Sequence, residues 1–411
     1  MWKNTPKKSF YVNLLDIGTS KIRCVIVRCK KGQAPEILGL STCPAKGIQN
    51  GAIIGLEKAT ECISLALKEA EEQANRQIET VFVNVSSTGL KSCYLQADMD
   101  FETPQPVTPI HLKKLVEQAL ETIDTKQEEI LHAIPLNYVL DQENTPEPLG
   151  LIGKHLTVQL HLVTIPRGTL TNLITVLDRC HVTIEEKVAT PYAAALASAT
   201  PDEKEIGCSV IDFGAGATHI AHFMKGIFVG LHTIDLGGNT LTRGIAQQLN
   251  CSLPTAEKIK LSYGSLFSFL GDIDEHFFVP IVGEQEEVQV SKRDLSALLN
   301  QGIDELLTQI SQTISGSEKG ALRWILTGGG SRLEGLSEKI SETQGRSTRL
   351  CTTRFPHLPE GVDEKTFSTC NGLLTYAIMK HQEAQMPTAI QKKKKKPSFL
   401  KKVWTWIIRN F

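Results

Sequence analysis

Two stretches of the same design, far apart in the chain, constrain its fold more than any other feature. In each, an apolar run ends in Asp-x-Gly and a few small residues, and a second run rich in β-branched residues follows. A single motif of this kind is an ordinary tight turn. Two of them in the same strand–turn–strand setting predict two similar halves. The stretches are Asp16 to Lys21, between runs 11–15 and 21–28, and Asp212 to Thr218, about 196 residues later, between runs 208–211 and 219–223.

Small residues at a turn between strands also suit phosphate binding. A phosphate requires several backbone N–H donors with no bulky side chain in the way. A carboxylate beside such a turn can hold Mg²⁺, usually through water. We therefore predict that the two turns bind the same phosphates from opposite sides, with Asp16 and Asp212 serving the metal. The predicted residues are Asp16, Gly18, Thr19, Ser20, Lys21, Asp212, Gly214, Gly216, Ala217 and Thr218.

Two further glycine clusters precede helical patterns in the second half. Gly237, Gly238 and Asn239 lead into a helix at 240–249, and Gly328, Gly329 and Gly330 come before a helix at 336–342. Open amides at a helix N-terminus bind anions, which makes the cluster Thr327 to Gly330 a candidate for contact with an adenine, ribose or phosphate group. The alternative for a triple glycine is a flexible loop. Neither the P-loop spacing nor a full G-x-G-x-x-G occurs, so P-loop and Rossmann folds are set aside.

Several other side chains are candidates for a chemical role. Glu257 and Lys260 share one face of a predicted helix, where they either form a surface ion pair or grip a ribose; the pattern alone favours the ion pair. His219 and His222 lie three apart on a strand and point to opposite faces, which favours structural roles over a shared metal. The sequence has no Cys/His cluster and no nucleophile elbow, so zinc and acyl-transfer chemistry have no support.

The region between the two turns predicts a mixture of helices and strands. We expect a helix at 56–73 and a strand at 80–85, after which the prolines at 104, 106 and 109 interrupt the chain. A helix at 111–123 and strands at 130–140 and 155–164 follow, and this segment could be a separate small α/β insert. Further helices are expected at 170–179 and 371–382.

Composition excludes several classes of protein. Hydrophobic residues make up 41% of the chain, as in a globular protein. The totals of 44 Lys plus Arg and 45 Asp plus Glu argue against a nucleic-acid binder. The ten cysteines include no C-x-x-C pair and predict reduced, buried thiols in a cytoplasmic protein. The apolar run after the basic start is too short for a signal peptide, and no stretch reaches the ~20 apolar residues of a membrane span.

The C-terminal segment differs from the rest of the chain. Residues 392–411 carry eight basic residues and no acid, which leaves 36 basic against 45 acidic residues before them. From Ser398 onward the apolar residues form one helical stripe, typical of a helix that lies in a membrane interface. The alternative is a helix docked on the protein's own core. The predicted membrane-binding residues are Phe399, Leu400, Lys401, Lys402, Val403, Trp404, Trp406, Ile407, Ile408, Arg409 and Phe411.

Several motifs, taken in order along the chain, resemble one protein family. The two turns and the triple-glycine loop are similar to the phosphate and adenosine motifs of the actin/hexokinase superfamily. More narrowly, the chain resembles the FtsA family of bacterial cell-division proteins over essentially its whole length. The matching stretches are Asp16 to Lys21, Lys46 to Gly51, Ala256 to Lys260, Tyr263-Gly264, Val279-Pro280, Thr327 to Gly335, Gly372 to Leu374 and the amphipathic C-terminus.

The resemblance implies an α/β, actin-like two-lobed ATPase fold with an inserted subdomain 1C and a C-terminal amphipathic helix. The first lobe, 1A, would comprise 1–84 and 164–195, with 1C at 85–163. The second lobe would have its core, 2A, at 196–230 and 310–382, and subdomain 2B at 231–309. A flexible basic linker at 383–397 and a membrane-targeting helix at 398–411 would follow.

The resemblance also implies a function. ATP with Mg²⁺ would bind in the cleft, through residues that include Gly237, Gly238, Asn239, Glu257, Lys260, Gly328, Gly329, Gly330 and Arg332. The protein would self-associate into filaments and, as a peripheral protein at the division site, tether FtsZ filaments to the inner face of the cytoplasmic membrane. Subdomain 2B would receive the C-terminal peptide of FtsZ, with charged contacts from residues such as Lys292, Arg293 or Glu305, and 1C would meet other division proteins. No catalytic residue is assigned, and weak or no ATPase activity is expected.

The chain departs from the family's usual pattern at three positions. Ala217 removes one donor hydroxyl from the second turn, Gly244 stands in place of an Asp, and Gly302 removes one cation from the predicted FtsZ-binding region.

Two alternative functions fit the sequence less well. A phosphotransferase of the sugar-kinase type would need a catalytic carboxylate aimed at a substrate hydroxyl, and no position can be assigned to one. A pilus-assembly ATP-binding adaptor would lack the terminal amphipathic helix.

Overall fold

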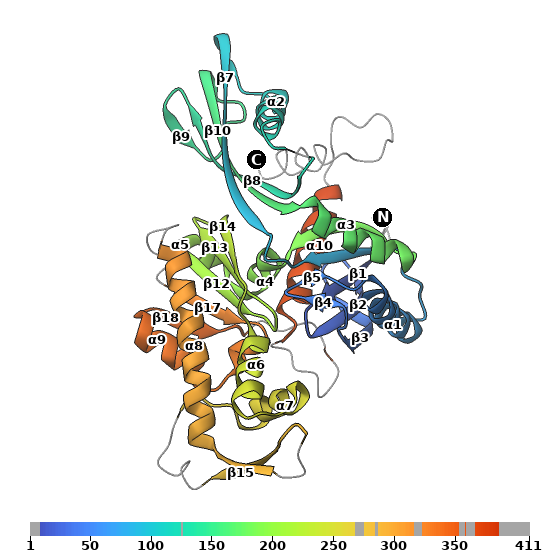
Figure 1. Cartoon of the computed structure of the whole chain (residues 1–411). Coiled ribbons are helices and arrows are strands. Elements are labelled where there is room, and N and C mark those ends of the chain that lie inside the picture. Colours follow the sequence, from blue (N-terminus) through green and yellow to red (C-terminus); the bar gives the residue numbers. More distant parts are fainter. Residues whose placement is uncertain are drawn as a thin grey trace.

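Two lobes, each built on a five-stranded sheet, carry a third, smaller sheet that projects from them (Figure 1). The computed structural model describes residues 9–124, 126–267, 275–283, 287–315, 323–352, 358 and 366–385. The actin-like two-lobed α/β architecture expected from the sequence is confirmed. No helix among these residues is long and apolar enough to cross a membrane.

The first lobe has the strand order β11-β6-β1-β2-β3. β1 pairs antiparallel with β2 and parallel with β6. Successive residues of β1 face opposite sides of the sheet: Leu15 and Ile17 pack toward helices α1 and α3, and Val12 and Leu14 pack toward α10. The elements are β1 (Phe10–Ile17), β2 (Lys21–Cys29), β3 (Glu36–Pro44), β6 (Thr80–Val85), β11 (Thr183–Ala189), α1 (Leu56–Ala74), α3 (Arg167–Arg179) and α10 (Ser368–Gln385).

The second lobe repeats this pairing with the order β14-β13-β12-β17-β18. β12 pairs antiparallel with β13 and parallel with β17, as β1 does with β2 and β6, which confirms the predicted repeat. Ile211 and Phe213 of β12 share a core with Leu299 and Ile303 of helix α8. The elements are β12 (Cys208–Phe213), β13 (Thr218–Met224), β14 (Ile227–Ile234), β17 (Arg323–Thr327), β18 (Ser347–Leu350), α4 (Thr190–Ser198), α5 (Pro201–Ile206), α8 (Lys292–Ser315) and α9 (Leu336–Gln344).

The outer part of the second lobe contributes two helices and a small sheet. Helices α6 and α7 pack on one another, and α6 also contacts α8. Strands β15 and β16 form an antiparallel pair at the end of the lobe that lies farthest from the insert (Figure 1). The elements are α6 (Gly238–Gln248), α7 (Leu253–Tyr263), β15 (His276–Pro280) and β16 (Glu287–Ser291).

The insert is a four-stranded antiparallel sheet in the order β7-β10-β8-β9, with one helix, α2, against it. The expectation that Pro104 and Pro106 break the chain is wrong, because both belong to β7. β7 is an edge strand, where a residue without a backbone N–H is tolerated. The break falls at Thr108, which caps α2. The elements are β7 (Lys91–Pro106), α2 (Pro109–Leu120), β8 (Glu128–Leu140), β9 (Glu143–Thr145) and β10 (Ile152–Pro166).

The insert is attached to the second lobe as well as the first. Tyr94 Oη of β7 donates to Val229 O (2.9 Å), and Ser92 Oγ accepts from Leu231 N (2.8 Å). His161 Nδ1 of β10 lies 3.2 Å from Phe228 O. Side chains of the insert thus form hydrogen bonds with backbone groups of the edge strand β14. Those groups would otherwise be open to pairing with another strand.

The ten cysteines are all free thiols, as the sequence predicted. Seven are buried and Cys62, Cys93 and Cys180 are half-buried. Burial raises the pKa of Cys208 and Cys29 to about 11, so these thiols stay protonated and unreactive near neutral pH.

Candidate nucleotide-binding site

The first hairpin is a tight turn that is held from behind. Gly18 N donates to Lys21 O (3.0 Å), and a Cβ at Gly18 would lie 2.9 Å from that same oxygen. Asp16 is buried at the end of β1, Gly18 and Thr19 are half-buried, and Ser20 and Lys21 are exposed. The turn therefore presents small groups to the space between the lobes and keeps its carboxylate inside.

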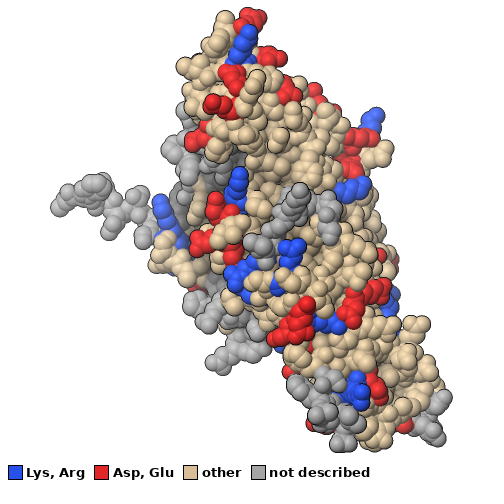
Figure 2. Space-filling model, turned by 90° about the vertical axis from the view of Figure 1, so that its left-hand side faces the viewer, with Lys and Arg blue, Asp and Glu red and all other residues tan. Residues whose placement is uncertain are grey.

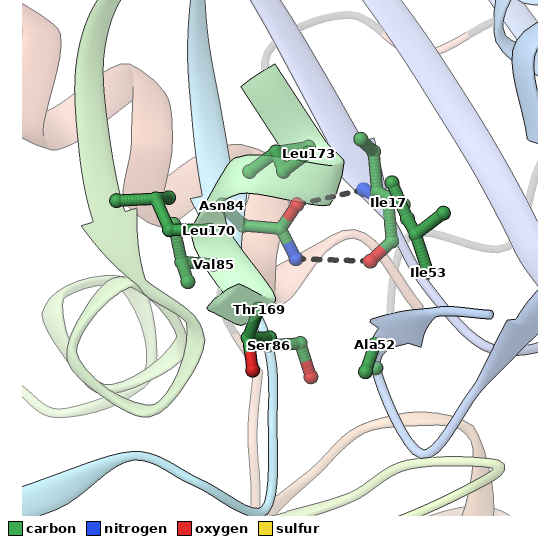
Figure 3. A pocket seen from close by; sticks show the side chains of 10 residues that line it. Ile17, Ala52, Ile53, Asn84, Val85, Ser86, Thr169, Leu170 and Leu173 are labelled. Atoms are coloured by element: carbon green, nitrogen blue, oxygen red, sulfur yellow. Dashed lines mark hydrogen bonds between the residues drawn. The ribbon is translucent and has the colours of Figure 1, made fainter. Parts of the chain in front are cut away.

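A small pocket lies behind this hairpin, where Asn84 at the end of β6 clamps β1 (Figure 3). Asn84 Oδ1 accepts from Ile17 N (2.7 Å), and its Nδ2 donates to Ile17 O (3.3 Å) and to Thr190 Oγ1 (3.0 Å). The polar groups of Asn84 are thus committed to fixing the strand that carries Asp16. The pocket is lined by Ile17, Gly51, Ala52, Ile53, Asn84, Val85, Ser86, Thr169, Leu170 and Leu173.

The second hairpin has the same form and carries helix α6 on its tip. Gly214 N donates to Ala217 O (3.0 Å), closing the turn. The amides of Gly238 and Asn239, two of the residues expected to bind nucleotide, donate to Gly214 O (3.0 Å) and Ala215 O (2.7 Å). A Cβ at Gly237 would lie 2.7 Å from the same two carbonyl oxygens. Gly237, Gly238 and Asn239 therefore fasten α6 to the hairpin. Thr218 is buried, and its Oγ1 donates to Leu236 O (2.8 Å).

The triple-glycine loop lies directly beside the second hairpin. Thr327, the last residue of β17, pairs with Asp212. Gly328 has φ of 82°, and a Cβ there would lie 2.1 Å from Asp212 Oδ1. A Cβ at Gly330 would lie 3.0 Å from Phe213 Cβ. Only glycine fits position 328, because both the space and the backbone conformation exclude a side chain. Gly329 and Arg332 are exposed, in a short 3₁₀ turn.

The tips of the two hairpins meet across the gap between the lobes. A Cβ at Gly216 would lie 2.6 Å from Thr19 Oγ1 and 2.9 Å from Asn50 Cα. Thr19 Oγ1 accepts from Gly51 N (3.0 Å), and the Asn50 side chain donates to Asp235. Ser86 Oγ of the first lobe lies 2.9 Å from His219 Nε2 of the second. The sequence predicted that the two turns face each other, and the structure brings them together.

The two predicted metal carboxylates have different surroundings. Both are buried, and burial raises the pKa of each. Asp16 Oδ2 is 3.3 Å from Arg23 Nη1, whereas Asp212 has no ion pair among the described residues. Burial first and the charge of Asp16 second raise the pKa of Asp212 to about 7. When Asp212 is ionised beside Asp16, a bound cation would offset the negative charge that Arg23 does not balance.

Sequence reasoning missed Arg23. The signal was present, because Arg23 is the only charged residue in the apolar run from Ile22 to Val27, and a buried strand seldom carries a cation without a partner. Asn84 was also missed. It is a common polar residue near a strand end, and nothing local distinguishes it from a turn residue. Thr327 was included only as the first residue of the glycine cluster, with no role assigned to its side chain.

Glu257 and Lys260 form the ion pair that the pattern favoured. Lys260 Nζ is 2.7 Å from Glu257 Oε2, and it also donates to Gly238 O (3.0 Å) and Thr242 Oγ1 (2.7 Å). Glu257 accepts from Thr242 Oγ1 as well (2.5 Å). The pair ties α7 to the start of α6, so both side chains lie near the second hairpin with their charges already partnered.

The residues present fit a phosphate group. The amides of Thr19, Ser20, Ala215 and Gly216 donate no hydrogen bond to the described part of the chain. Thr327 Oγ1 is buried beside Asp212 and has no partner among those residues. Unpaired donors of this kind at two facing glycine turns are what phosphate oxygens require. Two carboxylates without enough positive charge suit a hydrated Mg²⁺.

His219 and His222 have structural roles, as the sequence favoured. His222 Nδ1 is 2.9 Å from Ser209 Oγ, and burial lowers the pKa of both histidines to about 4, so both are neutral at physiological pH. The described residues include no group of three His, Cys, Asp or Glu side chains that could hold a metal ion.

The three residues predicted to bind a partner all lie on α8. Lys292 forms an ion pair with Glu275, and Arg293 and Glu305 are exposed. The face of the molecule that includes α8 carries acidic and basic side chains side by side, not a patch of one sign (Figure 2). The predicted membrane residues, 399–411, lie outside the described residues.

The structure explains two of the three departures from the family pattern. A Cβ at Gly302 would lie 2.5 Å from Leu241 Cδ2, so a larger residue there would require the Leu241 side chain of α6 to move. Ala217 is 4% exposed, so its methyl group fills buried space in the second turn. Nothing packs within 4 Å of a Cβ at Gly244, and the structure offers no reason for that glycine.

Comparison with known protein families gives two matches. A family model described as "Cell division protein FtsA" matches residues 209–372, and one described as "SHS2 domain inserted in FTSA" matches residues 88–164. The cell division protein FtsA of Agrobacterium fabrum is 33% identical over 388 residues, covering 90% of this chain and 87% of the relative. FtsA of Escherichia coli K12 is 26% identical, covering 97% of each chain.

Solved structures show the same fold at low identity. A chain of the PilM-PilN type IV pilus biogenesis complex superposes with a TM-score of 0.65 at 17% identity, covering 89% of this chain and 98% of its own. MreB5 of Spiroplasma citri, whose structure is bound to ADP, superposes with a TM-score of 0.54 at 12% identity, covering 92% and 99%. At these identities the likeness shows the fold alone.

Proposed function

The chain belongs to the FtsA family of cell division proteins, and from this premise we propose that it is an ATP-binding adaptor that links FtsZ filaments to the cytoplasmic membrane. In this proposal ATP and Mg²⁺ bind between the lobes, the protein self-associates, and the C-terminal segment attaches it to the inner membrane face at the division site. The observation that carries the nucleotide part is the pair of facing hairpins, whose tip amides have no hydrogen-bond acceptor among the described residues.

Residues of this chain would share the work of binding as follows. The amides of Thr19 and Ser20 hold phosphate oxygens from the first lobe, and those of Ala215 and Gly216 hold them from the second. The triple-glycine loop, which leads to Arg332, and the start of α6, with Lys260 bonded to it, would flank the nucleoside. Mg²⁺ would neutralise phosphate charge together with that of Asp212. Binding at both tips would stabilise the closed arrangement of the lobes.

Nucleotide binding is tested by titrating the full-length protein with a fluorescent ATP analogue in the presence of Mg²⁺. The wild type should saturate, and Gly216→Val should lose binding, because a Cβ there collides with Thr19. Gly244→Ala is the matched control, since its added methyl group meets nothing within 4 Å and should leave affinity unchanged. A wild-type protein without a saturable signal would remove the nucleotide proposal.

The membrane part rests on the amphipathic pattern of residues 398–411 and the lysines at 392–396. Each basic residue near an anionic surface adds about 1 kcal/mol of attraction, which salt screens. Trp404→Glu should move the protein from vesicles of phosphatidylglycerol and phosphatidylethanolamine into the soluble fraction, whereas Thr405→Glu, on the polar side, should release less. Equal retention of Trp404→Glu and wild type would indicate a segment that packs on the body instead.

The adaptor part predicts recruitment of FtsZ. Vesicles coated with this protein should collect FtsZ filaments that carry the C-terminal peptide and should not collect filaments truncated before it. A weak single contact suffices, because arrays of both partners make each further contact intramolecular. Glu305→Lys, on the exposed face of α8, should reduce recruitment more than the same change at Glu338 of α9. Equal recruitment of intact and truncated filaments would contradict this docking mode.

A further inference from the structure

Arg23 is a buried cation at the floor of the candidate site. Its Nη1 lies 3.3 Å from Asp16 Oδ2, and the two side chains are 10% and 8% exposed. The thiol of Cys370 donates to the same carboxylate oxygen at 3.7 Å. Asp16 is thus held from two sides by groups of the protein itself. A carboxylate that already has a guanidinium partner attracts a further cation much less than a free one does.

The same guanidinium also holds the start of the last described helix. Arg23 Nη2 donates to Thr366 Oγ1 (3.0 Å), and the guanidinium carbon lies 4.6 Å from the centre of the Phe367 ring. Thr366 and Phe367 immediately precede α10. A planar guanidinium can donate in two directions and stack on a ring at once, which an ammonium group cannot. Arg23 therefore joins the first hairpin to α10.

Asp212 has no comparable partner. None of the ion pairs among the described residues involves it. The nearby charge of Asp16 raises the pKa of Asp212, and the charge of Arg23 lowers it to a smaller extent. The residue opposite Asp212 on β13 is His219, whose ring is neutral and is bonded to Ser86 and Thr233. When both carboxylates are ionised, Asp16, Asp212 and Arg23 sum to one negative charge, and Asp212 is the carboxylate without an ion pair among the described residues.

On the basis of the proposed nucleotide function, we propose that Arg23 is a positioning residue that acts as the built-in counter-cation of Asp16, so that Mg²⁺ is held through Asp212 alone. Asp16 then fixes Arg23 and the start of α10. Asp212 would hold the metal through water, with the Thr327 hydroxyl beside it, which has no hydrogen-bond partner among the described residues. The two carboxylates that look equivalent in the sequence thus have different tasks.

The test compares the affinity for a fluorescent ATP analogue with Mg²⁺ and with EDTA. Arg23→Ala should increase the ratio of the two Kd values about tenfold over wild type, equivalent to about 1.4 kcal/mol, because the site then holds two unbalanced negative charges. Asp16→Asn leaves Arg23 without its ion-pair partner and should lower the Mg²⁺ dependence in part, whereas Asp212→Asn should lose it. Arg23→Ala with the wild-type ratio, or equal losses in both Asn variants, would overturn the proposal.

Two further measurements guard against loss of folding and against failure of the nucleotide proposal. The double variant Arg23→Ala/Asp16→Asn removes both charges of the ion pair and leaves Asp212 as in wild type. It should therefore regain the wild-type Mg²⁺ dependence. Loss of that dependence would contradict the inference. Without nucleotide, Mg²⁺ alone should raise the melting temperature of Arg23→Ala more than that of wild type. If no variant binds nucleotide, the proposed function fails, and the melting comparison still decides the role of Arg23: equal shifts would reject it.

Discussion

The two hairpins at the centre of the molecule share a fold and differ in charge. The residue directly across from the Asp is Arg23 in the first hairpin and His219 in the second. Residues opposite one another in an antiparallel pair are close neighbours on the same face. The first carboxylate therefore has a cation within 3.3 Å, and the second has a neutral ring that bonds elsewhere. The two hairpins therefore share their backbone turn, but the residue across from the Asp, Arg23 or His219, gives the two carboxylates different charged surroundings.

The largest expected effect concerns two glycines, one in the loop packed against the second hairpin and one in the turn of the first. Gly328→Val places a side chain 2.1 Å from Asp212 and in a left-handed conformation, and it should lower the free energy of unfolding by about 4 kcal/mol. Gly18→Val meets only Lys21 O at 2.9 Å and should cost about 1 kcal/mol. Urea unfolding measures both. Equal costs would mean that the contact of the triple-glycine loop with Asp212 is no tighter than the turn of the first hairpin.

The same substitution at the two carboxylates should change stability in opposite directions. Asp16→Asn weakens the partner of buried Arg23 and should destabilise the nucleotide-free protein by about 2 kcal/mol. Asp212→Asn removes a buried charge without an ion pair and should stabilise it by about 2 kcal/mol at pH 8. Denaturant unfolding at low salt provides the measurement. Changes of the same sign would show that Arg23 does not separate the two sites.

The pH dependence of stability should isolate Asp212. Its folded-state pKa of about 7 lies above the value near 3.9 of an unfolded Asp, so its protonated form stabilises the fold. That contribution is full below pH 4 and is lost as the pH rises through 7. The advantage of Asp212→Asn over wild type should therefore grow by up to about 1.4 kcal/mol per pH unit between pH 5 and 7 and then level off.

The difference between wild type and variant is the quantity to follow. His132, His161, His219 and His222 have lowered pKa values and act in the opposite sense, since stability from these neutral rings is lost as the pH falls below about 6.5. They act equally in both proteins and cancel in the difference. A gap that stays constant from pH 5 to 8 would contradict the raised pKa of Asp212.

The smallest expected effect comes from restoring a hydroxyl to the second turn. Ala217→Thr should tighten nucleotide binding by a few-fold, because one added hydrogen bond contributes about 1 kcal/mol or less after the turn accommodates the larger side chain. Ala217→Val, of similar shape but without the hydroxyl, is the control, and both are measured with the fluorescent analogue. Equal affinities of the two variants would show that position 217 does not face the phosphates.

Much of the fold followed from local sequence patterns. The strands on either side of both turns were predicted because apolar and β-branched runs bounded by glycine have few other stable forms. The Pro104–Pro106 segment was misjudged, since proline disfavours a strand except at a sheet edge, and position in the sheet is not a local property. Strand β14 was not predicted either. Backbone groups at its outer edge form hydrogen bonds with the side chains of Tyr94 and Ser92, more than 130 residues earlier in the chain.

By itself, the sequence determined the two Asp-x-Gly turns, the triple-glycine loop and their order along the chain, because each of these motifs depends only on a few consecutive residues. Tertiary structure alone decided which of these groups are free. It committed the amides of Gly238 and Asn239 to the second hairpin, paired Lys260 with Glu257, and gave Asp16 its cation. It also set Thr366 and Cys370 against this pair from 343 and 354 residues away. Burial and charge depend on such distant neighbours, so the electrostatics of the site appear only when the chain is folded.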